Sequence, residues 1–186
     1  MGPPPDPAVG TPWSIDAVRP HGPEVVLVQR WMAAPHVVEF WQQDWPLADW
    51  SAALARQLAG AHSRPWLVAL DGDPVAYVEV YRAARDVIAR EVAVDPHDLG
   101  IHIAIGDPDR TGQGLGPRVL RAVVDGLFAA DPRCARVLGD PDVAHQVARR
   151  AFAAAGFDPL AEVDLPHKRA SLVASTRADR AAAVDR

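Results

Sequence analysis

Apolar and polar positions repeat with two periods along the chain, and each period predicts one type of element. Alternating or continuous short apolar runs predict strands, and apolar residues three or four positions apart predict helices. We expect strands at residues 24–31, 64–70, 74–81, 99–105, 134–139, 161–165 and 170–175, and helices at residues 35–41, 47–60, 115–130 and 142–157. Hairpin strands early and strands alternating with helices later predict an α/β domain with a mixed central sheet flanked by helices.

Two signals in this pattern are especially specific. Asp71-Gly72 stands between two apolar runs and predicts a β-hairpin, because both residue types accept the backbone of a tight turn. The helix at 115–130 carries its apolar residues on one face and ends before an Asp-Pro pair. We expect its inward residues to be Leu120, Val123, Val124 and Leu127.

The two ends of the chain differ from this pattern. Residues 1–11 are dominated by proline and glycine and are expected to form a disordered tail. Residues 176–186 lack large apolar side chains and are expected to be a frayed tail or a loose helix. A chain of 186 residues that is 49% hydrophobic can bury one full core. We therefore expect a single domain at residues 12–175.

Composition and charge exclude several classes of function. The net charge is −5 and no basic block is present, so we expect no nucleic-acid partner. No apolar run is long enough for a membrane span, and the start of the chain does not resemble a signal peptide. Cys134 is the only cysteine, which excludes an internal disulfide. These features favour a soluble cytoplasmic protein.

Three glycines, Gly112, Gly114 and Gly116, separate the strand expected at 99–105 from the helix at 115–130. Such a turn exposes backbone N–H groups at the positive end of a helix dipole, and glycine lets a phosphate approach them. The spacing differs from G-x-G-x-x-G of dinucleotide folds and from G-x-x-x-x-G-K-[ST] of triphosphate loops. The turn predicts a pyrophosphate site of another type or, alternatively, an ordinary flexible connection.

The order of the segments resembles a known superfamily. A strand, the turn TGQGLG, a helix, a strand, Asp-Pro, a helix and Ala-Gly-Phe resemble the acyl-coenzyme A-binding core of the GNAT N-acyltransferases. A closer resemblance, over about residues 31–173, is to siderophore lysine N-acyltransferases of the mycobactin type. It rests on WQQDWPLADW, AYVEVYRAARDVI, DPHDLGIHIAI and DPRCARVLGDPD. The aminoglycoside 6'-N-acetyltransferases are similar more loosely, through HVVEFW, TGQGLG, LFAADP and GDP.

The resemblance implies a donor site for acyl-coenzyme A, carrying an acetyl or a longer acyl group. The glycine turn would hold the pyrophosphate of the coenzyme, and the preceding strand would lie along the rest of it. The residues implied are Ile103, Ala104, Ile105, Thr111, Gly112, Gln113, Gly114, Leu115, Gly116 and His145.

The resemblance also implies an acceptor site. Its catalytic residues would be His102, which contacts the acceptor, and Asp140, the proton acceptor; Trp45, Glu79 and Tyr81 would join His102 in binding substrate. The chemistry makes both catalytic roles plausible. A lysine amine has a pKa near ~10.4, so it arrives as an ammonium and must lose a proton before it attacks a thioester.

Structural roles compete with these functional ones. Asp140 precedes Pro141 at the expected start of a helix, where an aspartate caps the helix and a lowered pKa makes it a poor base. His102 alternates with Ile101 and Ile103, so it faces away from them. By composition alone, a hydrogen-bonded core histidine is the simpler interpretation.

Three positions depart from the GNAT pattern. Thr111 stands where many members have arginine or glutamine, so the phosphate contacts would rest on backbone N–H groups. His145 replaces an asparagine that usually follows Asp-Pro-Asp. Phe152 replaces a tyrosine thought to protonate the leaving sulfur. A thiolate is a tolerable leaving group, so the loss of this phenol need not abolish catalysis.

Taken with the resemblance, the sequence predicts an N-acyltransferase. It would move an acyl group from acyl-coenzyme A, or from an acyl carrier protein, to the N6 amine of lysine, hydroxylysine or a related diamine in siderophore biosynthesis. One alternative is an aminoglycoside 6'-N-acetyltransferase. The other is a non-catalytic acyl-coenzyme A-binding protein, which the three departures support. The seven histidines show no pair at metal-ligand spacing, so we expect no metal.

Overall fold

The computed structural model describes residues 1–184 and contains seven strands and six α-helices. The strands are β1 (Trp13–Ala17), β2 (Ser63–Leu70), β3 (Asp73–Arg82), β4 (Leu99–Ile105), β5 (Arg136–Gly139), β6 (Asp158–Leu165) and β7 (Lys168–Thr176). The helices are α1 (Pro23–Met32), α2 (Pro35–Trp41), α3 (Leu47–Ala59), α4 (Leu115–Ala130), α5 (Gln146–Ala154) and α6 (Arg177–Val184). Three short 3-10 helices are η1 (Ala83–Arg85), η2 (Val87–Arg90) and η3 (Pro108–Arg110).

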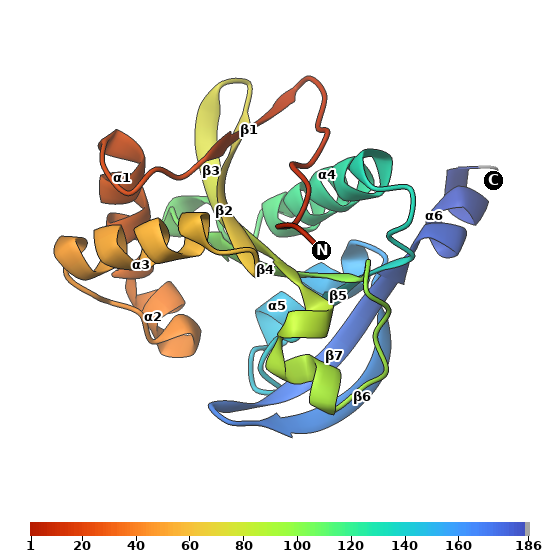
Figure 1. The fold of residues 1–186 in the computed structure, drawn as a ribbon. Helices are drawn as coiled ribbons and strands as arrows, with labels where there is room; N and C mark the ends of the chain where they lie inside the picture. The colour runs from red at the N-terminus through yellow and green to blue at the C-terminus, as the bar shows by residue number, and fades with distance from the viewer. Residues whose placement is uncertain (185–186) are drawn as a thin grey trace.

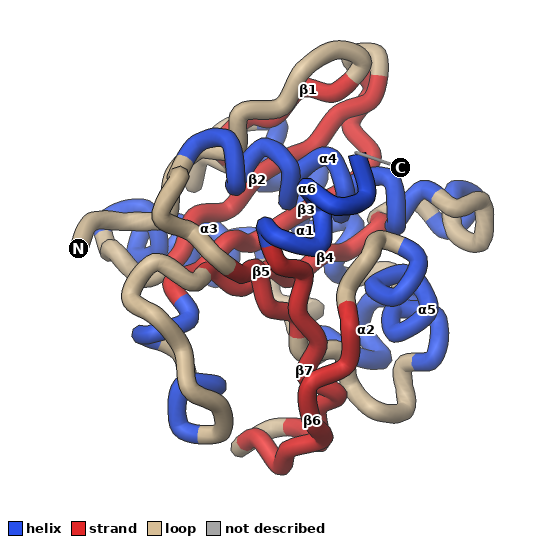
Figure 2. Tube along the Cα trace, turned by 90° about the vertical axis from the view of Figure 1, so that its right-hand side faces the viewer, coloured by secondary structure: helices blue, strands red, loops and turns tan. Residues whose placement is uncertain are grey.

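All seven strands form one mixed sheet in the order β1-β2-β3-β4-β5-β7-β6 (Figure 2). Every neighbouring pair is antiparallel except β4 and β5. These two parallel strands are paired only at Leu99 with Val137 and at Gly100 with Leu138. Because β4 continues to Ile105, the sheet parts between β4 and β5 beyond that short contact.

Helices cover both faces of the sheet (Figure 1). On one face, α4 and α5 pack against β2, β3 and β4, where Val119, Val123 and Leu127 join Val78 and Ile101 in the largest core cluster. On the other face, α1–α3 cover the β2, β3 and β4 side, and the 3-10 helices cover the β5 and β7 side. The second face therefore has two separate apolar clusters, one on each side of the parting.

Most of the expected elements are present, including the hairpin at Asp71-Gly72. Both residues of that turn have positive φ, 52° and 82°, as a tight hairpin turn requires. The four residues expected to face inward on the helix at 115–130 are all buried. The mixed α/β class predicted from the pattern is confirmed.

The segment at residues 24–31 is a helix, so the prediction of a strand there is wrong. Its valines are typical of strands, but Pro23 supplies a favourable first helical residue. Val25, Val28, Trp31 and Met32 are buried together, at the spacing of one helix face. The burial of one helical face of α1 therefore outweighs the strand preference of its individual valines.

The first eleven residues, expected to be a disordered tail, lie against the body of the protein. Carbonyl oxygens of Gly2 and Pro3 accept hydrogen bonds from the Arg82 guanidinium, and the Ala8 N–H donates to the Gly126 carbonyl. A side chain at Gly126 would lie 3.0 Å from the Ala8 backbone, so that close approach needs glycine. At the other end, where a frayed tail or a loose helix was expected, Arg177–Val184 form α6, and residues 185–186 lie outside the described part.

Candidate active site

A cluster of charged side chains lies where β4 and β5 part, between the two apolar clusters of one sheet face. Continuing the register of Leu99 with Val137 places His102 opposite Asp140, just beyond the last paired residues. The His102 Nε2 atom is 2.9 Å from Asp140 Oδ1. The sheet therefore brings together the two residues that sequence reasoning singled out for chemistry.

Glu79 lies on the other side of His102. The two residues are register partners on β3 and β4, so their side chains share a face. His102 Nδ1 is 3.4 Å from Glu79 Oε2, and Tyr77 donates a hydrogen bond of 2.7 Å to the other oxygen. The imidazole ring therefore stands between two carboxylates, one at each nitrogen.

The two carboxylates make His102 a cation at neutral pH. Burial by itself would lower the pKa of His102, but Asp140 and Glu79 outweigh it and raise the pKa to about 10. The side chain is still about one-third exposed, at 34%, so a substrate can reach it. A protonated imidazole donates from both nitrogens and holds no free lone pair, so it cannot accept a proton from the acceptor amine.

Asp140 is buried, 5% exposed, and bears a negative charge. Burial alone would raise its pKa, but His102 and then Lys168 outweigh that effect and hold the pKa well below its usual range. Lys168 Nζ is 2.9 Å from Asp140 Oδ2. The expected helix-cap role is wrong, because α5 begins at Gln146 and the cap position belongs to His145.

Tyr81 completes the cluster by donating a hydrogen bond of 3.2 Å to Asp140 Oδ1. Its ring lies across Gly100, where an added Cβ would come within 2.0 Å of the ring. Glycine is therefore required on β4 for the phenol to reach the carboxylate. Burial, and then the charge of Asp140, raise the pKa of Tyr81 well above its usual value, so the hydroxyl remains a donor.

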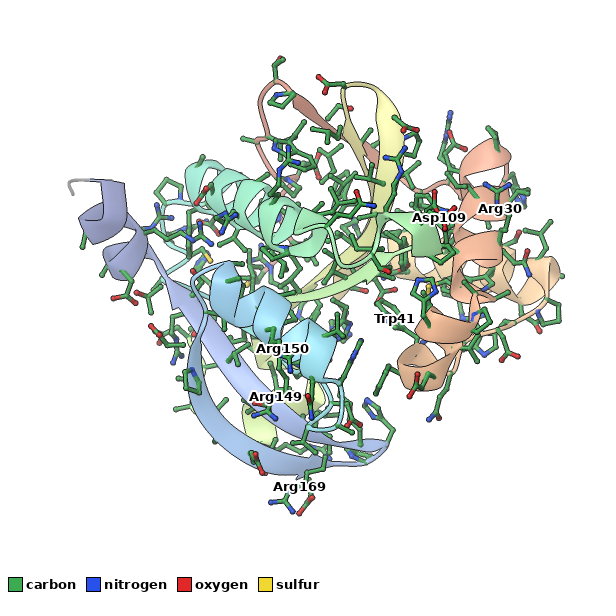
Figure 3. All side chains as sticks on the ribbon, turned by 180° about the vertical axis from the view of Figure 1, so that it is seen from behind. Arg30, Trp41, Asp109, Arg149, Arg150 and Arg169 are labelled. Atoms are coloured by element: carbon green, nitrogen blue, oxygen red, sulfur yellow. The ribbon has the colours of Figure 1, made fainter. Side chains whose placement is uncertain are left out.

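The tryptophans of the early helices divide between this cluster and the core. Trp41 at the end of α2 meets the His102 ring edge-on, with 5.9 Å between centroids; Figure 3 shows it from the opposite side to Figure 1. Trp45, expected to line the acceptor site, is 37% exposed and packs against Trp50. The aromatic neighbour of the charged cluster is therefore Trp41.

The glycine turn at residues 111–116 leads from η3 into α4. Gly112 and Gly114 have φ of 71° and 72°, and an added Cβ at either would meet no atom within 4 Å. Glycine is therefore needed for backbone conformation, not for space. Gly114 precedes the first residue of α4 without a side-chain cap, which leaves the N–H groups of that helix end open to a ligand.

Other residues expected at the donor site surround this region. Ile103, Ala104 and Ile105 occupy the part of β4 beyond its pairing with β5. His145 stacks on Phe40 of α2, with 3.7 Å between ring centroids, so its ring is engaged between α2 and α5. Phe152 is buried against Gly139 and Phe157, where it supplies no polar atom.

Sequence reasoning missed Lys168, which the β6–β7 hairpin brings to Asp140. One signal could have drawn attention to it, because it is the only lysine in a chain with eighteen arginines.

Within residues 1–184, no group of three or more His, Cys, Asp or Glu side chains is arranged to hold a metal ion. No helix in the same part of the chain is long and apolar enough to cross a bilayer.

Comparison with known proteins connects this geometry to a family. Residues 23–165 match the acetyltransferase (GNAT) domain. The lysine N-acyltransferase MbtK of Mycobacterium sp. (strain MCS) is 42% identical over 94% of this chain and 71% of its own length. The N(6)-hydroxylysine O-acetyltransferase of Escherichia coli is 35% identical over 80% of this chain and 47% of its own length.

Solved structures agree with the sequence relatives. The aminoglycoside acetyltransferase AAC(6')-Ib, in complex with coenzyme A and kanamycin, superposes with a TM-score of 0.80 at 28% identity. The alignment covers 89% of this chain and 95% of that one. Because the family match extends over most of the chain and agrees with relatives that align along nearly all of it, this protein belongs to the GNAT acetyltransferase family.

Proposed function

We propose that this enzyme transfers an acyl group from acyl-coenzyme A to the side-chain amine of lysine, N6-hydroxylysine or a related diamine, as a step in siderophore biosynthesis. The observation that carries the proposal is the pair of His102 and Asp140 at the parting of β4 and β5, with Glu79 and Tyr81 around it. The names of the relatives, which act on lysine, N6-hydroxylysine and N-hydroxyputrescine, supply the substrate class.

The donor would bind along β4 and at the glycine turn. Beyond Gly100 the edge of β4 is not paired with β5, so its peptide groups can pair with the amide groups of a pantetheine chain. The open N–H groups at the start of α4 suit a pyrophosphate. Thr111 brings no positive charge to this turn, so the backbone would supply the phosphate contacts. His145 would adjoin the coenzyme at the start of α5.

Asp140 would anchor the acceptor. A carboxylate with a strongly lowered pKa is a weak base but a stable counter-charge for an ammonium group. The ammonium would lose its proton through water before the nitrogen attacks the thioester carbonyl. His102 would hold Asp140 in place, and Trp41, which meets the His102 ring edge-on, would contact the aliphatic part of the acceptor.

The leaving sulfur would take up a proton without a phenol. Phe152 is buried and offers no acid, and the hydroxyl of Tyr81 is already donated to Asp140. The proton released by the acceptor ammonium balances the thiolate, so the overall step needs no further acid. This arrangement separates the chain from GNAT branches that depend on a tyrosine at position 152.

Two further features belong to the proposal. An acyl carrier protein is a second possible donor, because it presents the same pantetheine thioester. Arg149 and Arg150 are exposed side chains of α5 (Figure 3), and their positive charges would suit the phosphate group of such a donor. We also expect the reaction to take place in the cytoplasm, where acyl-coenzyme A is available.

A thiol-release assay with acetyl-coenzyme A tests the proposal directly. Lysine, N6-hydroxylysine and kanamycin are assayed separately, and the ratios of their specificity constants are compared. We expect lysine or N6-hydroxylysine to be favoured, because a site with one anionic anchor leaves the other ammonium groups of an aminoglycoside unpaired. Preference for kanamycin would establish the aminoglycoside function instead. No turnover, with coenzyme binding retained, would indicate a non-catalytic binding protein.

A further inference from the structure

Lys168 is the only lysine of the chain, which has eighteen arginines, and it lies beside the proposed reaction centre. Lys168 is the first residue of β7 and shares a sheet face with Ala170 and Leu172, which fill the neighbouring core. That face leads the side chain toward Asp140, and 18% of it remains exposed. A primary amine is therefore held, partly accessible, beside the proposed acceptor anchor.

The two oxygens of Asp140 have different partners. Oδ1 accepts hydrogen bonds from His102 and Tyr81, whereas Oδ2 is 2.9 Å from Lys168 Nζ. An acceptor ammonium that binds Asp140 must approach Oδ2, since Oδ1 is already saturated. The chain's own amine thus occupies the position at which the proposed function places the substrate amine.

We propose that Lys168 is itself an acyl acceptor, so that the enzyme acylates its own side chain when no amine substrate is present. The inference rests on the proposed function, because it needs an acyl thioester bound at the parting of β4 and β5. Lysine and the proposed acceptor carry the same functional group, and Asp140 holds both in the same way. Self-acylation then requires no residue beyond those of the proposed reaction.

The step is balanced. The Lys168 ammonium releases one proton, its nitrogen forms a bond to the carbonyl carbon, and the carbon–sulfur bond breaks as the nitrogen gives up a second proton. The thiolate takes up a proton, so acyl thioester and ammonium become amide, thiol and one released proton. The product lacks the charge that paired with Asp140 Oδ2 and places an acyl group beside it. An acylated chain should therefore bind an amine acceptor less well.

An arginine at this position separates charge from reactivity. Guanidinium keeps the ion pair with a carboxylate but stays protonated, so it does not attack a thioester at neutral pH. Lys168→Arg is therefore the matched control for a purely electrostatic role. Asp140→Asn is the second variant, because it keeps the amine and removes the anchor.

The test incubates the full chain with acetyl-coenzyme A and no acceptor, and follows intact mass and the acetylated peptides with time. The α-amine of the chain is an internal reference for uncatalysed acetylation, because it is a primary amine like that of Lys168. We expect one acetyl group per chain on Lys168, added at least about tenfold faster than on the α-amine. Lys168→Arg should gain only the slow α-amine adduct, and Asp140→Asn should lose the preference.

Parallel thiol-release assays with lysine and N6-hydroxylysine distinguish the two levels of the argument. Acceptor turnover with Lys168 unmodified overturns the inference and leaves the proposed function in place. Neither turnover nor adduct, in a protein that acetyl-coenzyme A does not protect against heat, overturns the proposed function and the inference with it. Acetylation of Lys168 no faster than of the α-amine, or equally fast in Asp140→Asn, is uncatalysed chemistry and also overturns the inference.

Discussion

The charged cluster around Asp140 lies beside the middle of β4, the glycine turn at residues 111–116 lies beyond the end of that strand, and the two regions are built in opposite ways. The cluster consists of side chains that lie close together because their strands, β3, β4 and β5, are paired in a fixed register. The turn consists of backbone, with two left-handed glycines and an uncapped helix start. One region is specified by which residues are present, and the other by which conformations the chain can adopt.

This difference predicts separable defects. A substitution in the cluster changes charge and proton positions near the acceptor, and leaves the backbone that would bind the coenzyme intact. A substitution in the turn changes the direction of N–H groups, and leaves the charges of the cluster intact. Variants of the two regions should therefore divide between loss of rate and loss of coenzyme affinity.

The largest effect is expected for Asp140→Asn. The amide keeps the shape of the side chain but leaves His102 and Lys168 without their common counter-charge. We expect turnover to fall about a hundredfold or more, with protection by coenzyme A retained, as measured by thiol release and thermal melting. Asp98→Asn is the control, because Asp98 is also buried but pairs with Arg136 away from the cluster. Normal turnover of Asp140→Asn with a lowered melting temperature would limit Asp140 to a structural role.

Gly114→Val should give the second largest effect. A valine at φ of 72° is strained by about 1–3 kcal/mol and turns the helix start away from its present geometry. We expect protection against heat by acetyl-coenzyme A to be lost at concentrations that protect the unaltered protein. Gly156→Val carries the same type of strain at φ of 83°, after α5, and should keep the protection. Equal protection of both variants would show that the turn does not bind the coenzyme.

The smallest effect concerns the pH dependence of stability. The folded pKa of His102, about 10, lies above its ordinary value of 6.5, so the folded protein retains a proton that the unfolded chain releases. Its contribution is complete below about pH 6.5 and is lost as the pH rises toward 10. Between about pH 6 and pH 9 the melting temperature should fall a few degrees more for the unaltered protein than for His102→Gln. The same pH dependence of the melting temperature in both proteins would contradict the raised pKa of His102.

The sequence pattern predicted those parts of the fold in which local preference and burial agree. The hairpin at Asp71-Gly72 and the apolar face of α4 are examples. Residues 24–31 were misassigned because β-branched residues favour strands locally, while burial of one face against the sheet favours α1. Disorder was expected at residues 1–11 because proline excludes helix and inner strand, but proline does not prevent the backbone of this segment from contacting Arg82.

The candidate site was predictable only in part, for a geometric reason. His102 and Asp140 were identified by resemblance, and sheet register explains their meeting afterwards. The partner role of Glu79 depends on the β3–β4 register, which composition does not specify. Lys168 and Trp41 reach the cluster from the β6–β7 hairpin and from the end of α2, so their positions depend on the tertiary arrangement of the whole domain.

Two residue pairs form the ladder between β4 and β5, so beyond them the two strands are held by packing and side-chain contacts and not by backbone pairing. His102 belongs to the half made of β1–β4, whereas Asp140 and Lys168 belong to the half made of β5–β7. Any ligand that spreads the halves must lengthen the 2.9 Å contact between His102 and Asp140 and weaken the mutual charge stabilisation of the two groups. For such a ligand, occupancy of its site would be thermodynamically linked to affinity at the other substrate site, and the linkage would act equally in both directions.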